Sequence, residues 1–112
     1  MANNGKLGKA LSQANQWVTL YTVPATGVVF ATVNISVVNK DGSIANSDIV
    51  ITNASNPANI LPEDYIGYQD ELLAGGGSVE YLCQLMSPGE SVMVRVSNAV
   101  SAIRVSGLEK AA

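Results

Sequence analysis

Hydrophobic and polar residues alternate with a period of two along most of the chain, which is typical of β-strands with one buried face. The clearest case is the segment 28–39, VVFATVNISVVN. One face is apolar from Val29 to Val37, whereas the opposite face mixes Phe30 and Val38 with threonine, asparagine and serine. The pattern predicts a long strand whose core-facing residues are Val29, Ala31, Val33, Ile35 and Val37.

The same alternation recurs in shorter segments that turn-forming residues separate. These segments are 16–23, 47–52, 65–73, 78–86, 91–97 and 102–108. Asp41-Gly42 and the run Gly75 to Gly77 are typical of hairpin turns, because glycine accepts the backbone angles of a tight turn. The segment 53–64 contains two prolines and three asparagines, which indicates a long excursion outside the sheets.

Seven to eight short strands at this spacing, without a long helical period, indicate an all-β protein. We expect an antiparallel β-sandwich or a jelly-roll-like fold, with a small barrel as the alternative. A chain of 112 residues is long enough for one hydrophobic core. Residues 16–112 would form this single domain.

The first fifteen residues interrupt the pattern. They are polar and contain glycine, and Lys6 and Lys9 stand there without any acidic residue. For residues 1–15 we therefore expect an extended N-terminal arm, not a strand, that contacts outside the domain would order. Leu7 and Leu11 lie four positions apart and could form one edge of a short helix, although so short a helix is marginal in water.

The composition predicts a folded protein with a weakly charged surface, since 47% of the residues are hydrophobic and only 13% are charged. Such a surface is typical of a protein covered by neighbours, and a soluble monomer is the alternative. No apolar run approaches the ~18 residues that a membrane-spanning helix needs, and the N-terminus lacks the apolar segment of a signal peptide. We expect no membrane partner, and a protein made and assembled in a cytoplasm.

The residue content excludes most catalytic chemistry. The chain has no histidine and a single cysteine, Cys83, so it lacks the commonest general base and cannot form a thiolate zinc site. The alternation places Cys83 on one face with Val79 and Tyr81, where we expect a packed core thiol. We predict no catalytic residue, no metal site and no cofactor. The net charge of -3, with dispersed basic residues, also argues against a nucleic-acid partner.

One acidic and aromatic segment leaves another function open. Glu63 and Asp64 precede a predicted strand that carries Tyr65 and Tyr68. Carboxylates beside aromatic rings occur in calcium and carbohydrate sites. A carbohydrate-binding or calcium-binding β-sandwich is therefore an alternative to a purely structural role, and solvated loop charges are the plainer interpretation.

Two longer segments resemble small structural proteins of tailed bacteriophages. These segments are LYTVPATGVVFATVNISVVN at 20–39 and LLAGGGSVEYLCQLMSPGESVMVRVS at 72–97. In that family a LYTVPAG-like strand and turn open a β-sandwich, and an SPGE-like turn precedes a VxVxxS strand near its end. The resemblance covers residues 16–108. The chain departs from the commoner form at Thr26, which stands between Ala25 and Gly27.

The resemblance implies a non-enzymatic virion structural protein. Within the virion we expect a capsid cement or decoration protein on the head exterior. It would bind the major capsid protein as a homotrimer, and it would be assembled in the host bacterial cytoplasm. A tail, collar or fibre adaptor is the alternative. We expect the N-terminal arm to dock on the capsid through Leu7, Lys9 and Leu11.

Large aromatic residues dominate many protein interfaces. We therefore expect subunit contacts at Trp17, Phe30 and Tyr68, with ordinary core packing as the alternative for each. Phe30 is the best of the three candidates, because the opposite face of its strand already supplies the core.

Overall fold

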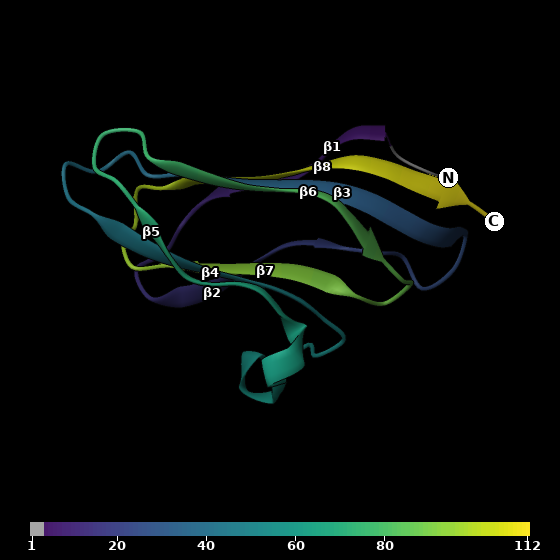
Figure 1. The fold of residues 1–112 in the computed structure, drawn as a ribbon. Helices are drawn as coiled ribbons and strands as arrows, with labels where there is room; N and C mark the ends of the chain where they lie inside the picture. Colours follow the sequence, from purple (N-terminus) through teal and green to yellow (C-terminus); the bar gives the residue numbers. More distant parts are fainter. Residues whose placement is uncertain (1–3) are drawn as a thin grey trace.

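The chain folds into two four-stranded antiparallel sheets that pack face to face (Figure 1). The computed structural model describes residues 4–112. The expected all-β sandwich is confirmed. The elements are β1 (Asn4–Leu11), β2 (Gln16–Thr22), β3 (Val28–Val38), β4 (Ala45–Thr52), the 3₁₀ turns η1 (Pro57–Asn59) and η2 (Pro62–Asp64), β5 (Tyr65–Leu72), β6 (Ser78–Met86), β7 (Ser91–Val96) and β8 (Ala102–Ala111).

Strand pairing is nested along the chain. β1 pairs with β8, β2 with β7, β3 with β6 and β4 with β5. Further pairing of β3 with β8 and of β4 with β7 produces the sheet orders β1-β8-β3-β6 and β2-β7-β4-β5. This is the connectivity of an eight-stranded jelly roll, in which a long antiparallel ribbon is rolled into two sheets.

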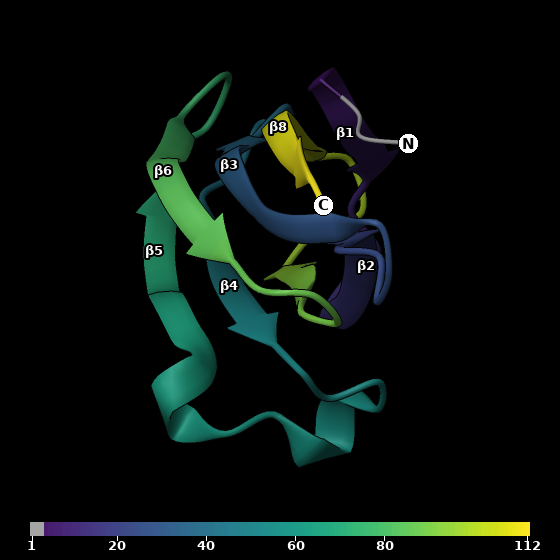
Figure 2. The same cartoon turned by 90° about the vertical axis from the view of Figure 1, so that its right-hand side faces the viewer.

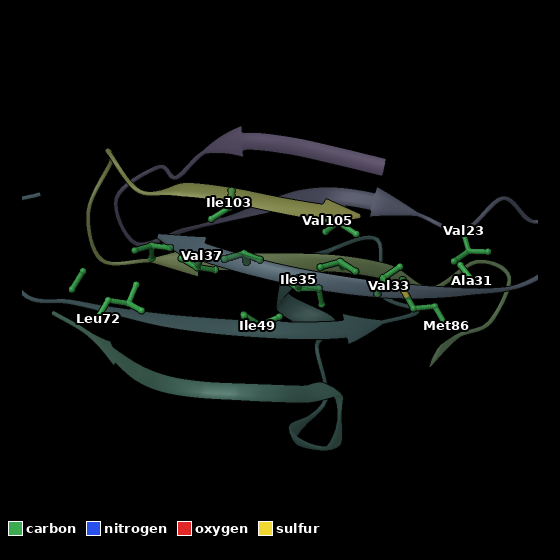
Figure 3. Packing of buried hydrophobic residues seen from close by; sticks show 14 of the residues in the cluster. Val23, Ala31, Val33, Ile35, Val37, Ile49, Leu72, Met86, Ile103 and Val105 are labelled. Atoms are coloured by element: carbon green, nitrogen blue, oxygen red, sulfur yellow. The ribbon is translucent and has the colours of Figure 1, made fainter. Parts of the chain in front are cut away.

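The core lies between the two sheets and consists mainly of valine and isoleucine (Figure 3). Four of the five core positions predicted for the 28–39 segment are completely buried, namely Ala31, Val33, Ile35 and Val37. The prediction for Val29 is wrong, because a register shift between Val28 and Phe30 places Val28 inward and leaves Val29 52% exposed. The β3 alternation therefore identifies the core face correctly beyond this bulge.

The predicted hairpins are wrong. The Asp41-Gly42 loop joins β3 to β4 and the glycine run Gly75 to Gly77 joins β5 to β6, and each of these connections passes from one sheet to the other. The β4–β5 connection stays within one sheet, and it is the long excursion that carries η1 and η2. Turn chemistry alone does not distinguish a hairpin from a crossing between sheets.

Buried Asn39 holds together the loops at one end of the sandwich. Its side-chain amide donates hydrogen bonds to the carbonyl groups of Ser43, Leu72 and Leu73 at 2.9, 3.2 and 3.2 Å. Its side-chain oxygen accepts a hydrogen bond of 3.0 Å from Asn98 in the β7–β8 loop. These contacts satisfy backbone groups that the crossing loops would otherwise leave unpaired.

Residues 4–11 of the expected N-terminal arm form a strand, which corrects the sequence prediction. β1 is hydrogen-bonded along its length to β8, with Lys9 opposite Arg104. Leu7 packs against the core, as does Leu20 of β2. A Cβ atom at Gly8 would lie only 2.1 Å from the carbonyl oxygen of Leu20, so glycine is needed where the two strands meet. Residues 1–3 of the expected arm lie outside the described residues.

Each long edge of the sandwich carries a tyrosine that is hydrogen-bonded to a carboxylate on the other sheet. Tyr81 of β6 bonds to Asp70 of β5 at 2.5 Å, and Tyr21 of β2 bonds to Glu109 of β8. Figure 2 shows β5 beside β6 at one edge and β1 close to β2 at the other. Burial and the neighbouring carboxylate raise the pKa of Tyr81 to about 12, and the same two causes raise the pKa of Tyr21.

Candidate functional site

The outer face of the β1-β8-β3-β6 sheet carries an exposed apolar row. Thr32 of β3 lies opposite Leu85 of β6 on one side and opposite Leu108 of β8 on the other. The neighbours of Thr32 along β3, Ala31 and Val33, are completely buried in the core, so Thr32 and its two partners point outward. Leu85 is 67% exposed and Leu108 is 58% exposed.

Two further large residues extend this row. Phe30 lies two positions before Thr32 on the same side of β3 and is 39% exposed. Leu82 of β6 follows the inward-facing Tyr81 and is 59% exposed. We call Phe30, Leu82, Leu85 and Leu108 the apolar patch. A group of large exposed apolar residues on one sheet face is a candidate interaction surface.

Positive charge lies on the β1–β8 side of the same sheet face. The outward positions of β1 and β8 hold four of the six basic residues of the chain, which are Lys6, Lys9, Arg104 and Lys110. On the four strands the one outward acidic residue is Glu80, since Glu109 is buried and bonded to Tyr21. Within residues 4–112 none of the four cations forms an ion pair.

A shallow groove of about 560 Å³ lies at the end of the face away from the apolar patch. It is lined by Lys9, Ala10, Leu11, Ser36, Val38, Ala102, Ile103 and Arg104. The groove combines two cations with aliphatic side chains, and none of the described residues that line it is acidic. We call the apolar patch, the four cations and the groove together the docking face.

Cys83 is exposed next to the docking face, so the predicted core thiol is wrong. β6 has an additional residue opposite Asn34, and Cys83 adopts a left-handed φ of 57° at this bulge. The Asn34 side-chain oxygen accepts a hydrogen bond of 2.9 Å from the Cys83 backbone N–H. The bulge reverses the alternation, so that Tyr81 faces inward before it and Met86 faces inward after it.

The structure separates the sequence-predicted site residues. Lys9, Leu11 and Phe30 lie on the docking face, and Leu11 is 59% exposed. Leu7 packs against the core instead. Trp17 and Tyr68 lie on the opposite outer face, that of the β2-β7-β4-β5 sheet, where Trp17 is partly buried and Tyr68 is 65% exposed.

The sequence interpretation missed most of the apolar patch. It found Phe30 from the outward phase of β3, but it did not single out Leu82, Leu85 or Leu108 as surface residues. Their grouping depends on the bulge in β6 and on the placement of β8 beside β3. Neither feature has a signal within the local sequence.

The acidic segment before β5 is engaged in local structure. The carboxylate of Asp64 accepts hydrogen bonds from the Thr52 hydroxyl at 2.8 Å and from the Leu61 backbone N–H at 3.0 Å. In the described part of the chain, no group of three or more acidic or cysteine side chains is placed to hold a metal ion. The Asp64 carboxylate therefore serves to anchor η2 to the end of β4.

None of the helices in residues 4–112 has the length and hydrophobicity to cross a membrane.

Comparisons of the chain with protein-family models, with curated proteins and with solved structures gave no significant match.

Proposed function

We propose that this chain is a non-enzymatic virion structural protein, a cement or decoration protein that binds the outside of an assembled phage head. The observation that carries the proposal is the docking face, on which exposed leucines and phenylalanine share one sheet face with four cations that form no ion pair within residues 4–112. The sequence resemblance supplies the virion context. Jelly rolls are also used by viral capsid and lectin domains, which agrees with the proposal without carrying it.

The composition of the docking face defines the partner. Burial of the apolar patch would supply most of the binding free energy, at roughly 25 cal/mol for each Å² removed from water. Lys6, Lys9, Arg104 and Lys110 would favour an acidic surface on the major capsid protein and would accelerate its encounter with the chain. The broad side of the molecule measures 44 × 28 Å. It is therefore large enough to hold a standard interface, in which each partner buries ~800 Å².

Stabilisation of the head would follow from mass action. A protein that binds the assembled, expanded shell, and not its unassembled subunits, shifts the equilibrium toward that shell. We propose a homotrimer at local threefold positions, because three weak docking faces on one particle bind far more tightly than one. The cationic face would make this binding weaker at high salt.

The experiment is co-sedimentation of the purified chain with expanded empty heads and, separately, with isolated tails at low and high salt. Light scattering gives the mass of the free protein beforehand. We expect a trimer that saturates heads, with an affinity that falls as salt increases. Binding to tails but not heads would contradict the cement proposal in favour of a tail or collar adaptor, and binding to neither would contradict a virion role.

A further inference from the structure

The outer face of the β2-β7-β4-β5 sheet has a different chemistry from the docking face, and we propose that it binds a neutral saccharide. This inference does not depend on the virion role. It rests on an exposed aromatic ring beside a polar hollow. Both lie on the side of the sandwich opposite the docking face, so the two surfaces can be occupied at the same time (Figure 1).

Three aromatic rings form a continuous cluster on this face. Trp17 and Tyr65 pack edge to face with ring centroids 6.1 Å apart, and Tyr65 packs in the same way against Tyr68 at 5.4 Å. The guanidinium of Arg95 lies 4.6 Å from the centroid of the Trp17 ring. These contacts fix the inner rings, and they leave Tyr68 as the exposed member, on the border of a shallow hollow with Ile60 and Pro62.

A second hollow of about 230 Å³ has only polar residues in its lining, and one of them is Gln69, the chain neighbour of Tyr68. It is lined by Asn15, Asn46, Asp48, Gln69, Arg95 and Ser97. Gln69 connects the two hollows, because its side-chain amide donates a hydrogen bond of 3.4 Å to the Tyr68 hydroxyl. The ring and the polar groups are thus adjacent on one surface.

The charges in this polar hollow are already neutralised. Asp48 accepts hydrogen bonds from Arg95 at 2.8 and 3.1 Å and from the Gln69 backbone N–H at 2.7 Å. By contrast, the side-chain amides of Asn15 and Asn46 form no hydrogen bond to other described residues. The groups in this hollow that are free to bind a ligand are therefore uncharged hydrogen-bond donors and acceptors, not charged groups.

The ligand that matches this combination is a neutral saccharide. One side of a pyranose ring presents C–H groups that pack on an aromatic ring, and its hydroxyl groups both donate and accept hydrogen bonds. Planar amides offer one acceptor and two donors each, which suits adjacent hydroxyl groups. The Asp48–Arg95 ion pair carries no net charge, so it would not attract an anionic or a cationic ligand. We therefore assign the stacking contact to Tyr68 and the hydroxyl contacts to Asn15, Asn46 and Gln69.

The experiment is an NMR titration of the full, isotope-labelled chain with neutral oligosaccharides at millimolar concentration. The probes are linear glucans, chitin oligosaccharides and mannans of four to six sugars. For at least one probe we expect saturable shifts confined to residues 15–17, 46–48, 65–69 and 95–97. Tyr68→Ala should weaken that binding roughly tenfold and Asn46→Ala roughly fivefold. Leu85→Ser on the docking face should leave it unchanged.

Tyr68 and Asn46 are both exposed, so the two substitutions should not disturb folding, and the spectrum of each free variant verifies this. The inference is overturned if no probe causes saturable shifts, if the shifts lie on the docking face, or if Tyr68→Ala binds as tightly as the unmodified chain. A failure of this kind leaves head binding untouched, because head binding is measured on the other face.

Discussion

Tyr81 and Asp70 join the two sheets at the β5–β6 edge of the sandwich through a hydrogen bond of 2.5 Å. The pair also explains a glycine inside a strand. A Cβ atom at Gly67 would lie 2.7 Å from both the Tyr81 hydroxyl and an Asp70 carboxylate oxygen. At the other edge Tyr21 and Glu109 make the equivalent contact. Most connections between consecutive strands cross from one sheet to the other. The two tyrosine–carboxylate hydrogen bonds join the sheets in addition, one along each open edge of the sandwich.

Removal of the Tyr81 hydroxyl should loosen one of these edges. Tyr81→Phe leaves the partly buried Asp70 carboxylate without its donor, and we expect a loss of about 1–2 kcal/mol in the free energy of unfolding. Urea denaturation measures this loss. Tyr68→Phe is the matched control, because the Tyr68 ring is exposed and its substitution should change stability by less than about 0.5 kcal/mol. Equal effects of the two substitutions would contradict a role for the Tyr81–Asp70 pair.

The same pairs make stability sensitive to alkaline pH. The folded chain raises the pKa of Tyr81 from 10.0 to about 12, so the folded state retains a proton that the unfolded state loses. Stability should therefore be constant with respect to this group below pH 10 and should fall between pH 10 and about 12. Unfolding by urea across this range tests the prediction. The double variant Tyr21→Phe, Tyr81→Phe should show a flatter decline, and an equally steep one would refute the assignment.

Strand β1 should be part of the folding unit. Gly8→Ala would place a Cβ atom 2.1 Å from the Leu20 carbonyl oxygen and force the β1–β2 edge apart. We expect a loss of roughly 2–4 kcal/mol in the free energy of unfolding. Gly42→Ala is the control, since a Cβ atom there meets nothing within 4 Å. If Gly8→Ala were as harmless as this control, residues 4–11 would behave as a detached arm.

The Cys83 thiol should be reactive in the folded protein. It is exposed at the β6 bulge, next to the apolar patch. We expect a thiol reagent to modify one cysteine per native chain without denaturant. A bulky maleimide at this position should also reduce binding to phage heads, whereas the unlabelled variant Cys83→Ser should bind normally. If the thiol reacted only after the chain had unfolded, the exposed position of Cys83 at the bulge would be contradicted.

The sequence was informative about where strands occur and uninformative about how they pair. Alternation located the core face of β3, because Ala31, Val33 and Ile35 obey a period of two wherever pairing is regular. It failed at Val29 and Cys83, because each lies at a bulge that local hydrophobicity does not encode. β1 was missed because glycine-rich, polar residues are stabilised there by pairing with β8, at the far end of the chain.

The docking face was only partly predictable for the same reason. Phe30 could be found from one strand, since its own strand supplied an apolar face on the other side. The grouping of Phe30 with Leu85 and Leu108 requires β6 and β8 to flank β3, which is a property of the nested pairing. Lys9 was predicted as a cation on an arm, and its actual place opposite Arg104 follows from the β1–β8 register.

The most direct test of the docking face is the occupancy of expanded phage heads by Leu85→Glu, compared with Tyr68→Glu on the opposite face. Both residues are about equally exposed, so both variants should fold, and each adds the same charge. We predict that Leu85→Glu lowers the affinity for heads at least tenfold, because it places a carboxylate in the apolar patch that head binding would bury. Tyr68→Glu should saturate heads like the unmodified chain. Equal occupancy by the two variants, or a loss only with Tyr68→Glu, would contradict the assignment of the docking face.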